Sequence, residues 1–308
     1  MNSIISVNEK QECSRAQACP STGSHWEADL SLRIEKTAWG SCLSDNRHQG
    51  PLYVQKPFYP EGRGLPHIYL LHPPGGLVSG DSLHIRAEVG AGAGVLLTTP
   101  GAGRIYRARA GEQRQQQQTD LCLAAGSSLE WLPLETIIYP GAQANLETRI
   151  NLVHDCLFMG WELTCLGLPA SGGSFDSGSL RQGFRIDCDG FPVLLENLVL
   201  DATGRALLAA AAGLQGYTTS GIFVIGPLPG ERAESLLAML RATQAAPDDG
   251  SRTGMTLVGP TGSQSSFIIA RYLGHCAEAC RRFFIGLWQL LRPLVLGRDA
   301  CQPRIWAT

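Results

Sequence analysis

The sequence predicts an all-β fold, with many short strands in layered sheets and two peripheral α-helices. Short strand-like apolar runs alternate with turns rich in glycine and proline, of which the chain has 36 and 18. Only two segments have convincing helical spacing. The 308 residues can form a single large all-β domain. We therefore expect a polar, disordered tail over residues 1–25 and one β-rich domain over residues 26–308.

The expected strands are of two kinds. Some runs alternate apolar and polar residues, which predicts strands with one buried face, whereas others are continuously apolar, which predicts strands buried on both faces. The alternating runs span residues 30–34, 83–89 and 146–152, and the continuous runs span residues 94–99 and 156–166. Residues 184–188 and 193–199 flank Asp189-Gly190, which predicts a hairpin with a type I′ turn.

Two segments are expected to be helical. In residues 231–243 the leucines share one face. In residues 276–291 cysteine, phenylalanine and leucine side chains recur at helical spacing, and Pro293 is expected to end the helix. The glutamine tract at residues 115–118 is expected at a solvated strand end or in a loop.

Composition narrows the class of function. Charged residues make up 17% of the chain, against roughly 25% in a typical soluble domain. Either a partner covers part of the surface, or the composition is simply rich in glycine and alanine. The net charge of −2 gives no electrostatic case for nucleic acid or for an anionic membrane.

The expected location is the cytoplasm. No apolar run reaches membrane-spanning length, and the N-terminal residues lack the pattern of a signal peptide. The ten cysteines are therefore expected to be thiols in a reducing compartment. None forms a C-x-x-C pair, so we expect no structural zinc site.

Several catalytic motifs are absent from the sequence. A P-loop needs a lysine directly after a glycine, and none of the three lysines, Lys10, Lys36 and Lys56, follows one. We therefore expect no nucleotide bound or hydrolysed by that route. Neither G-x-S-x-G nor H-E-x-x-H occurs. Residues 90–94 lack the spacing of a dinucleotide-binding loop and are expected to form a tight turn.

The most distinctive string is HPPGGLVSGD at residues 72–81, after an expected strand at residues 67–71. Its two prolines and its glycines should hold the loop in one shape. Further strings follow in order at residues 98–102, 132–139, 160–162, 167–172, 192–196, 291–293 and 303–308. As an ordered set, over residues 30–308, the strings closely resemble the UreD (also called UreH) family of urease accessory proteins.

The resemblance implies a β-rich protein without catalytic activity or a tightly bound cofactor. It implies assembly with UreF, which recruits the GTPase and nickel carrier UreG. The complex would dock on apo-urease and support delivery of nickel to the carbamylated-lysine site. The missing P-loop fits this division of labour, because nucleotide chemistry would belong to a partner.

Four carboxylates, Asp81, Glu135, Glu162 and Glu196, lie in or beside apolar strand stretches. A buried carboxylate is costly unless it is paired or binds a cation. One hypothesis is that they line a path for nickel in transit, because oxygen ligands release nickel(II) more readily than imidazole or thiolate clusters. The alternative is that they pair with arginines or accept hydrogen bonds from backbone amides.

Other candidate residues are weaker. Ser79, Thr98 and Thr99 could supply neutral oxygens beside the path. His72 is expected to fix its loop by hydrogen bonding rather than to bind metal.

The last candidates lie toward the C-terminus. The cysteines of the cluster His275, Cys276 and Cys280 are expected in the core. Residues 187–189 are expected to be exposed, and Trp306 to be a docking anchor for a partner.

Two rival functions remain. A β-sandwich hydrolase could use Glu135 and Glu162 as acid and base, although the resemblance argues against it. A structural β protein unrelated to metal is the third hypothesis.

Overall fold

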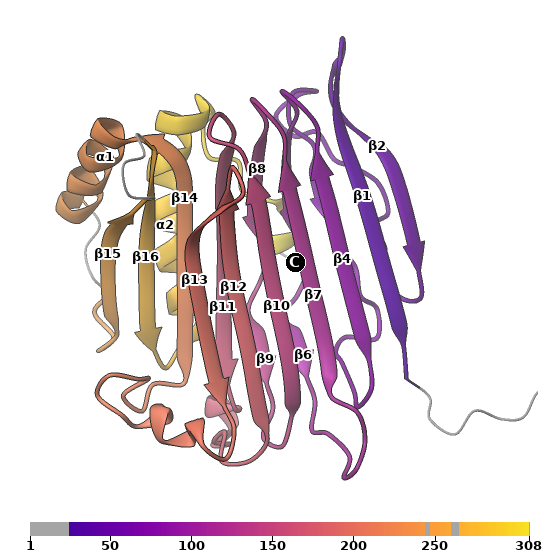
Figure 1. Cartoon of the computed structure of the whole chain (residues 1–308), viewed down its shortest axis with the longest axis vertical. Helices are drawn as coiled ribbons and strands as arrows, with labels where there is room; N and C mark the ends of the chain where they lie inside the picture. Colours follow the sequence, from indigo (N-terminus) through magenta and orange to yellow (C-terminus); the bar gives the residue numbers. More distant parts are fainter. Residues whose placement is uncertain (1–24, 244–246, 260–264, 308) are drawn as a thin grey trace, which may run out of the picture.

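The computed structural model describes residues 25–243, 247–259 and 265–307. Two β-sheets pack face to face, and helices cover the outer face of one sheet (Figure 1). The predicted fold class is therefore confirmed. The tail expected over residues 1–25 lies outside the described residues, apart from His25. No helix in the described ranges is long and apolar enough to cross a membrane.

The first sheet has seven strands in the order β13-β12-β10-β7-β4-β1-β2. Its strands are β1 Glu27–Thr37, β2 Gly40–Gln49, β4 Ser82–Val89, β7 Gln115–Leu123, β10 Gln143–Leu152, β12 Ser179–Cys188 and β13 Phe191–Leu200. Its inner face is apolar and its outer face is mostly polar, as the period-two runs predict, although β13 exposes Phe191, Leu195 and Val199.

The second sheet has nine strands, with the path β15-β16-β14-β11-β8-β5-β3 and with β6 and β9 joined beside β11. Its strands are β3 His67–Tyr69, β5 Gly94–Thr98, β6 Gly103–Ile105, β8 Ser128–Leu132, β9 Thr136–Ile138, β11 Leu157–Leu166, β14 Thr219–Pro229, β15 Arg252–Val258 and β16 Ser265–Gly274. Both of its faces are covered, which explains the continuously apolar runs of β5 and β11.

The central strands wind as a solenoid. The chain passes from β4 to β5, from β7 to β8 and from β10 to β11, changing sheet each time. Equivalent strands of successive turns then pair in parallel, as β4 with β7 and β5 with β8. Each turn therefore adds one strand to each sheet, and the space between the sheets runs along the whole stack.

Two α-helices, α1 Gly230–Thr243 and α2 Ala277–Leu296, cover the outer face of the nine-stranded sheet. Both predicted helices are confirmed, but α2 does not end before Pro293. It continues to Leu296, where Gly297 adopts φ 62° and donates its amide to the Pro293 carbonyl at 3.1 Å. A proline in the last turn removes few helical hydrogen bonds, so the helix can end after it. Within the described ranges, short 3₁₀ helices also occur at Pro169–Ser171, Gly204–Leu208 and Arg304–Ala307.

Local predictions in the strands are largely confirmed. Asp189 and Gly190 have φ of 50° and 80°, as a type I′ turn between β12 and β13 requires. The glutamine tract does begin a strand, β7. Gln115 itself is buried rather than solvated, because its side chain bonds the Tyr106 carbonyl and the Gln143 amide.

The prediction for Trp306 was wrong. The side chain is partly buried, with its ring 5.9 Å from that of Trp161 and 6.3 Å from that of Trp288. Its Nε1 donates to Thr98 Oγ1 at 2.9 Å. The end of the chain folds back onto the aromatic cluster beneath α2, so Trp306 stabilises the fold and offers no free anchor.

A buried ion cluster lies in the same layer. Arg292 of α2 is fully buried and pairs with Glu61 at 2.7 Å and Glu130 at 2.9 Å. Trp288 Nε1 also donates to Glu130, at 2.6 Å. The cluster joins the helix to the nine-stranded sheet, and each carboxylate has an opposite charge beside it.

Candidate functional site

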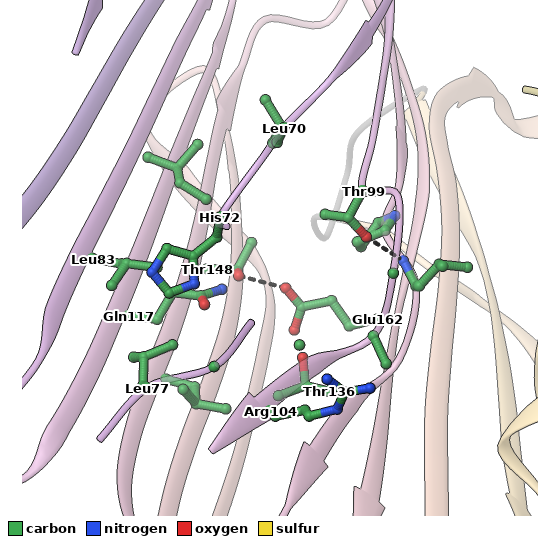
Figure 2. A pocket seen from close by; sticks show the side chains of 18 of the residues that line it. Leu70, His72, Leu77, Leu83, Thr99, Arg104, Gln117, Thr136, Thr148 and Glu162 are labelled. Carbon is green, nitrogen blue, oxygen red and sulfur yellow. Dashed lines mark hydrogen bonds between the residues drawn. The ribbon is translucent and has the colours of Figure 1, made fainter. Parts of the chain in front are cut away.

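A cavity of about 270 Å³ lies between the two sheets (Figure 2). Leucine and isoleucine side chains form much of its wall, and loops at residues 72–77 and 99–104 form its rim. Its polar lining includes His72, Thr99, Gln117, Thr148, Glu162 and Gln182. These residues come from both sheets, so the solenoid brings together positions that are far apart in the sequence.

The rim loop at residues 72–81 has the fixed shape that its prolines and glycines predict. The Asp81 carboxylate is 2% exposed and accepts the amides of Trp26 and Val78, both at 2.8 Å. A Cβ on Gly76 would lie 2.5 Å from the Tyr106 ring, so only glycine fits there. Asp81 thus accepts backbone amides and lines neither this cavity nor the larger one described below.

Glu162 lies in the middle of β11 and faces β10. Thr148 Oγ1 donates to its carboxyl group, and Gln182 forms a second hydrogen bond to it. Gln182 is held in turn by Thr164, whose Oγ1 donates to the Gln182 amide oxygen at 3.0 Å. Within the described part of the chain no basic side chain pairs with Glu162. The carboxyl group is therefore hydrogen-bonded but has no opposite charge to balance it.

Burial raises the pKa of Glu162 to about 7, although the hydrogen bonds from Thr148 and Gln182 oppose this shift. Near neutral pH the group is therefore divided between its acid and its carboxylate form. Part of its surface stays accessible because it faces open space on both sides. A buried carboxyl group with this environment is typical of functional sites.

A second cavity, of about 630 Å³, shares Glu162 and Gln182 with the first. Glu196 of β13 and Arg271 of β16 also line it. These two side chains form an ion pair that joins the sheets, and both are partly exposed. Glu162 and Gln182 therefore stand where the two cavities meet, and Glu196 lies farther out, in the second.

Glu135 lies elsewhere. It lines neither cavity, and its charge instead raises the pKa of the thiols of Cys165 and Cys280, in addition to the larger effect of their burial. Cys280 belongs to α2, which covers the outer face of the nine-stranded sheet, whereas Glu162 faces the inner side. The structure therefore does not bring Glu135 and Glu162 together as an acid and base, as the hydrolase hypothesis requires.

The weaker candidates near the rim differ in whether they line the cavity. Ser79 Oγ accepts the amide of Arg109 at 2.7 Å, and Thr98 bonds Leu132 and Trp306 away from the cavity. Thr99 lines the cavity and accepts the Leu134 amide at 2.9 Å.

His72 was expected to fix its loop by a hydrogen bond. Its ring instead faces the cavity, with Nε2 buried and without a partner in the described ranges. Burial lowers its pKa, so the ring is neutral near pH 7.

Near α2, Cys280 is buried as expected, whereas His275 and Cys276 are exposed. Among the residues that the structure describes, no three histidine, cysteine or acidic side chains converge as a metal-binding group.

Sequence analysis missed several cavity residues, namely Thr148, Gln182, Gln117, Trp131 and Arg104. Thr148 and Gln182 occupy inward positions of their strands, with apolar residues two positions before and after each, whereas Gln117 lies within the polar start of β7. A polar residue at an inward position is a usable signal, because its burial needs a partner. Trp131 gives a further sign of a polar interior, since its Nε1 is buried without a hydrogen-bond partner in the described chain.

Comparison with known proteins gives a consistent result. A family model described as "UreD urease accessory protein" matches residues 27–307. A relative named "Urease accessory protein UreD" from Marinomonas sp. (strain MWYL1) is 46% identical over 291 residues, covering 92% of this chain and 91% of the relative. Proteins of the same name from Psychromonas ingrahamii and Saccharophagus degradans are 41% and 38% identical, over 92% and 100% of this chain and 94% and 100% of their own lengths.

Proposed function

Since the chain belongs to the UreD urease accessory protein family, we propose that it is a non-enzymatic scaffold for inserting nickel into apo-urease. In this proposal it assembles with UreF in the cytoplasm, UreF recruits the GTPase UreG, and the complex docks on apo-urease. The relatives are named as accessory proteins rather than enzymes, which supports a non-catalytic role. The sequence lacks a P-loop, so GTP hydrolysis is assigned to UreG.

The two cavities, which share Glu162 and Gln182 in their linings, form the proposed path for nickel. The observation that carries this proposal is Glu162, a carboxyl group without a balancing cation at the point where both cavities meet. A nickel ion in transit needs ligands that hold it only weakly, and carboxylate, hydroxyl and amide oxygens suit this better than thiolate clusters. Glu162, Thr148 and Gln182 supply all three kinds of oxygen.

Each of these residues has a distinct part in the proposed transfer. The carboxylate form of Glu162 attracts the cation, and a pKa of about 7 makes loss of its proton easy at neutral pH. Thr148 and Gln182 hold the carboxyl group at the junction. Glu196 would meet the ion in the outer cavity, where Arg271 competes for its charge. The path includes neither Asp81 nor Glu135, which lie outside both cavities.

The proposal is tested by co-expressing Glu162→Gln with UreF, UreG and apo-urease. The change keeps the volume and the hydrogen bonds but removes the negative charge. The complex should assemble normally, while the nickel content and activity of the urease fall. Glu196→Gln should give a smaller loss, because Arg271 already neutralises Glu196. Glu88→Gln, on the outer face of the first sheet, is the matched control.

Two results would contradict the proposal. One is an intact complex that loads urease fully with nickel in the Glu162→Gln variant. The other is failure of the wild-type chain to associate with UreF or apo-urease in pull-down experiments.

A further inference from the structure

A basic loop borders the rim of the first cavity. Residues 104–114 contain four arginines and one glutamate, a net charge of +3 in a chain whose total is −2. The loop joins β6 to β7, at the lower end of the sheets in Figure 1. Positive charge is thus concentrated at one end of a molecule that is otherwise acidic.

Three of these arginines, Arg104, Arg107 and Arg114, form no ion pair within the described residues, and Arg114 donates to Ser179 Oγ at 3.2 Å instead. Arg104 and Arg107 are exposed, and neither forms an ion pair with any residue that the structure describes. Arg104 also lines the cavity, where Figure 2 shows it beside Thr136 and below Glu162. Arg109 has a partner, but its pair with Glu112 is long, at 3.4 Å, and solvent-exposed.

The basic loop is held firmly in place. Its Arg104 carbonyl accepts the Leu77 amide at 2.8 Å, and the Tyr106 amide donates to the Leu77 carbonyl at 3.0 Å. The Arg109 amide donates to Ser79 at 2.7 Å. The rim loop and the basic loop are thus one preorganised surface, which lowers the entropic cost of binding a partner.

This charge conflicts with free passage of a cation. The Arg104 guanidinium in the cavity lining, with the other loop arginines near it in sequence, raises the local potential and repels a divalent ion, most strongly at low salt. An acidic surface laid over the mouth would neutralise the arginines and remove that barrier. The barrier is useful at an exit, because it keeps the ion inside until the recipient has docked.

We propose that the basic loop docks an acidic surface of the protein that receives the metal, and that this docking opens an otherwise electrostatically closed mouth. The inference rests on the proposed function and adds to it the exit, the chemistry of the recipient surface and a control on release. The rest of the chain carries a net −5, by difference from the totals for the loop and the whole chain. This charge disfavours a polyanion or an anionic bilayer as the occupant, since either would extend beyond the small loop.

The closed mouth can be tested on the full chain copurified with UreF. Nickel entry is followed by stopped-flow quenching of tryptophan fluorescence, with Trp131→Phe identifying the signal from the cavity. The double variant Arg104→Gln, Arg107→Gln should admit Ni²⁺ about three- to tenfold faster at low salt. Wild-type entry should accelerate as salt is added, because screening weakens the barrier. Equal rates for the two proteins would overturn the barrier.

Docking is tested by capturing apo-urease with the same proteins. The double variant should bind apo-urease about tenfold more weakly, and its binding should depend less on salt. The variant Arg104→Lys, Arg107→Lys retains the charge and should bind nearly as wild type. Arg86→Gln removes an exposed charge from the outer face of β4 and is the control. Circular dichroism should show the same fold in all four proteins.

The outcomes separate this inference from the proposed function. Unchanged capture of apo-urease by the double variant overturns the docking role alone. The same conclusion follows if the double variant binds UreF more weakly but still captures apo-urease as the wild type does. Salt-sensitive binding of the wild type to anionic vesicles, lost in the double variant, would assign the loop to a membrane instead. If the wild-type chain captures no apo-urease at all, the proposed function itself fails.

Discussion

Replacing Glu162 with glutamine should stabilise the protein at alkaline pH. Folding raises the pKa of this carboxyl group from 4.5 to about 7. Between these values the folded state binds more protons than the unfolded state, so the free energy of unfolding falls as pH rises. A shift of this size corresponds to about 3 kcal/mol once the pH exceeds 7. Glutamine keeps the hydrogen bonds but carries no charge, so the variant does not lose this stability as the pH rises.

The measurement is urea unfolding of both proteins from pH 5 to pH 8, followed by tryptophan fluorescence. The difference between their free energies of unfolding should be only about 1 kcal/mol at pH 5, because this pH lies just above the ordinary pKa of 4.5. As the pH rises, the free energy of unfolding of the glutamine variant should increasingly exceed that of the wild type, by about 3 kcal/mol at pH 8. Glu88→Gln, in an exposed ion pair, should show no such gain. Parallel curves for Glu162→Gln and wild type would refute the assignment of an uncompensated, buried carboxyl group.

Three further changes test other parts of the structure. Trp306→Ala should lower the free energy of unfolding, measured in urea, by about 2–3 kcal/mol, because the ring packs in the aromatic cluster. An unchanged free energy of unfolding would show that Trp306 does not contribute to this packing. Arg292→Leu removes the opposite charge beside Glu130 and leaves Glu61 paired only with His67. It should cost about 3–5 kcal/mol in the same assay, whereas Arg282→Leu on the exposed face of α2 should cost less than about 0.5 kcal/mol. Asp81→Ala removes the acceptor of two amides and should speed hydrogen exchange in residues 72–81; unchanged exchange there would show that the loop holds its shape without it.

The fold class was predictable because it depends on local patterns. Each of the patterns used depends only on a short stretch of chain. They are the period-two alternation in β1, β4 and β10 and the glycine at the β12–β13 turn. The solenoid winding was not predictable from such patterns. Alternation shows which face of a strand is buried, but the choice of neighbour strand and its parallel direction arise from contacts between distant turns.

The candidate site was partly predictable for the same reason. Glu162 was selected because it interrupts an apolar strand, and the structure places it at the junction of two cavities. Glu196 was selected on similar grounds but pairs with Arg271, which lies 75 positions away in the sequence. The placement of Trp306 failed because its neighbours, Trp161 and Trp288, are joined to it only by the fold.

Two carboxylates, Glu130, which is buried, and Glu162, which is partly buried, show what sequence patterns cannot supply. Glu130 and Glu162 both lie within apolar strands of the same sheet. Glu130 faces α2, where Arg292 and Trp288 satisfy it from about 160 positions away. Glu162 faces the first sheet, where it finds only neutral donors. An unbalanced charge weakens the folded state, so the environment of Glu162 supports the role proposed for it better than a structural one. The proposed nickel-path residue therefore differs from the structural one in the partner that it lacks, and only the assembled fold reveals this difference.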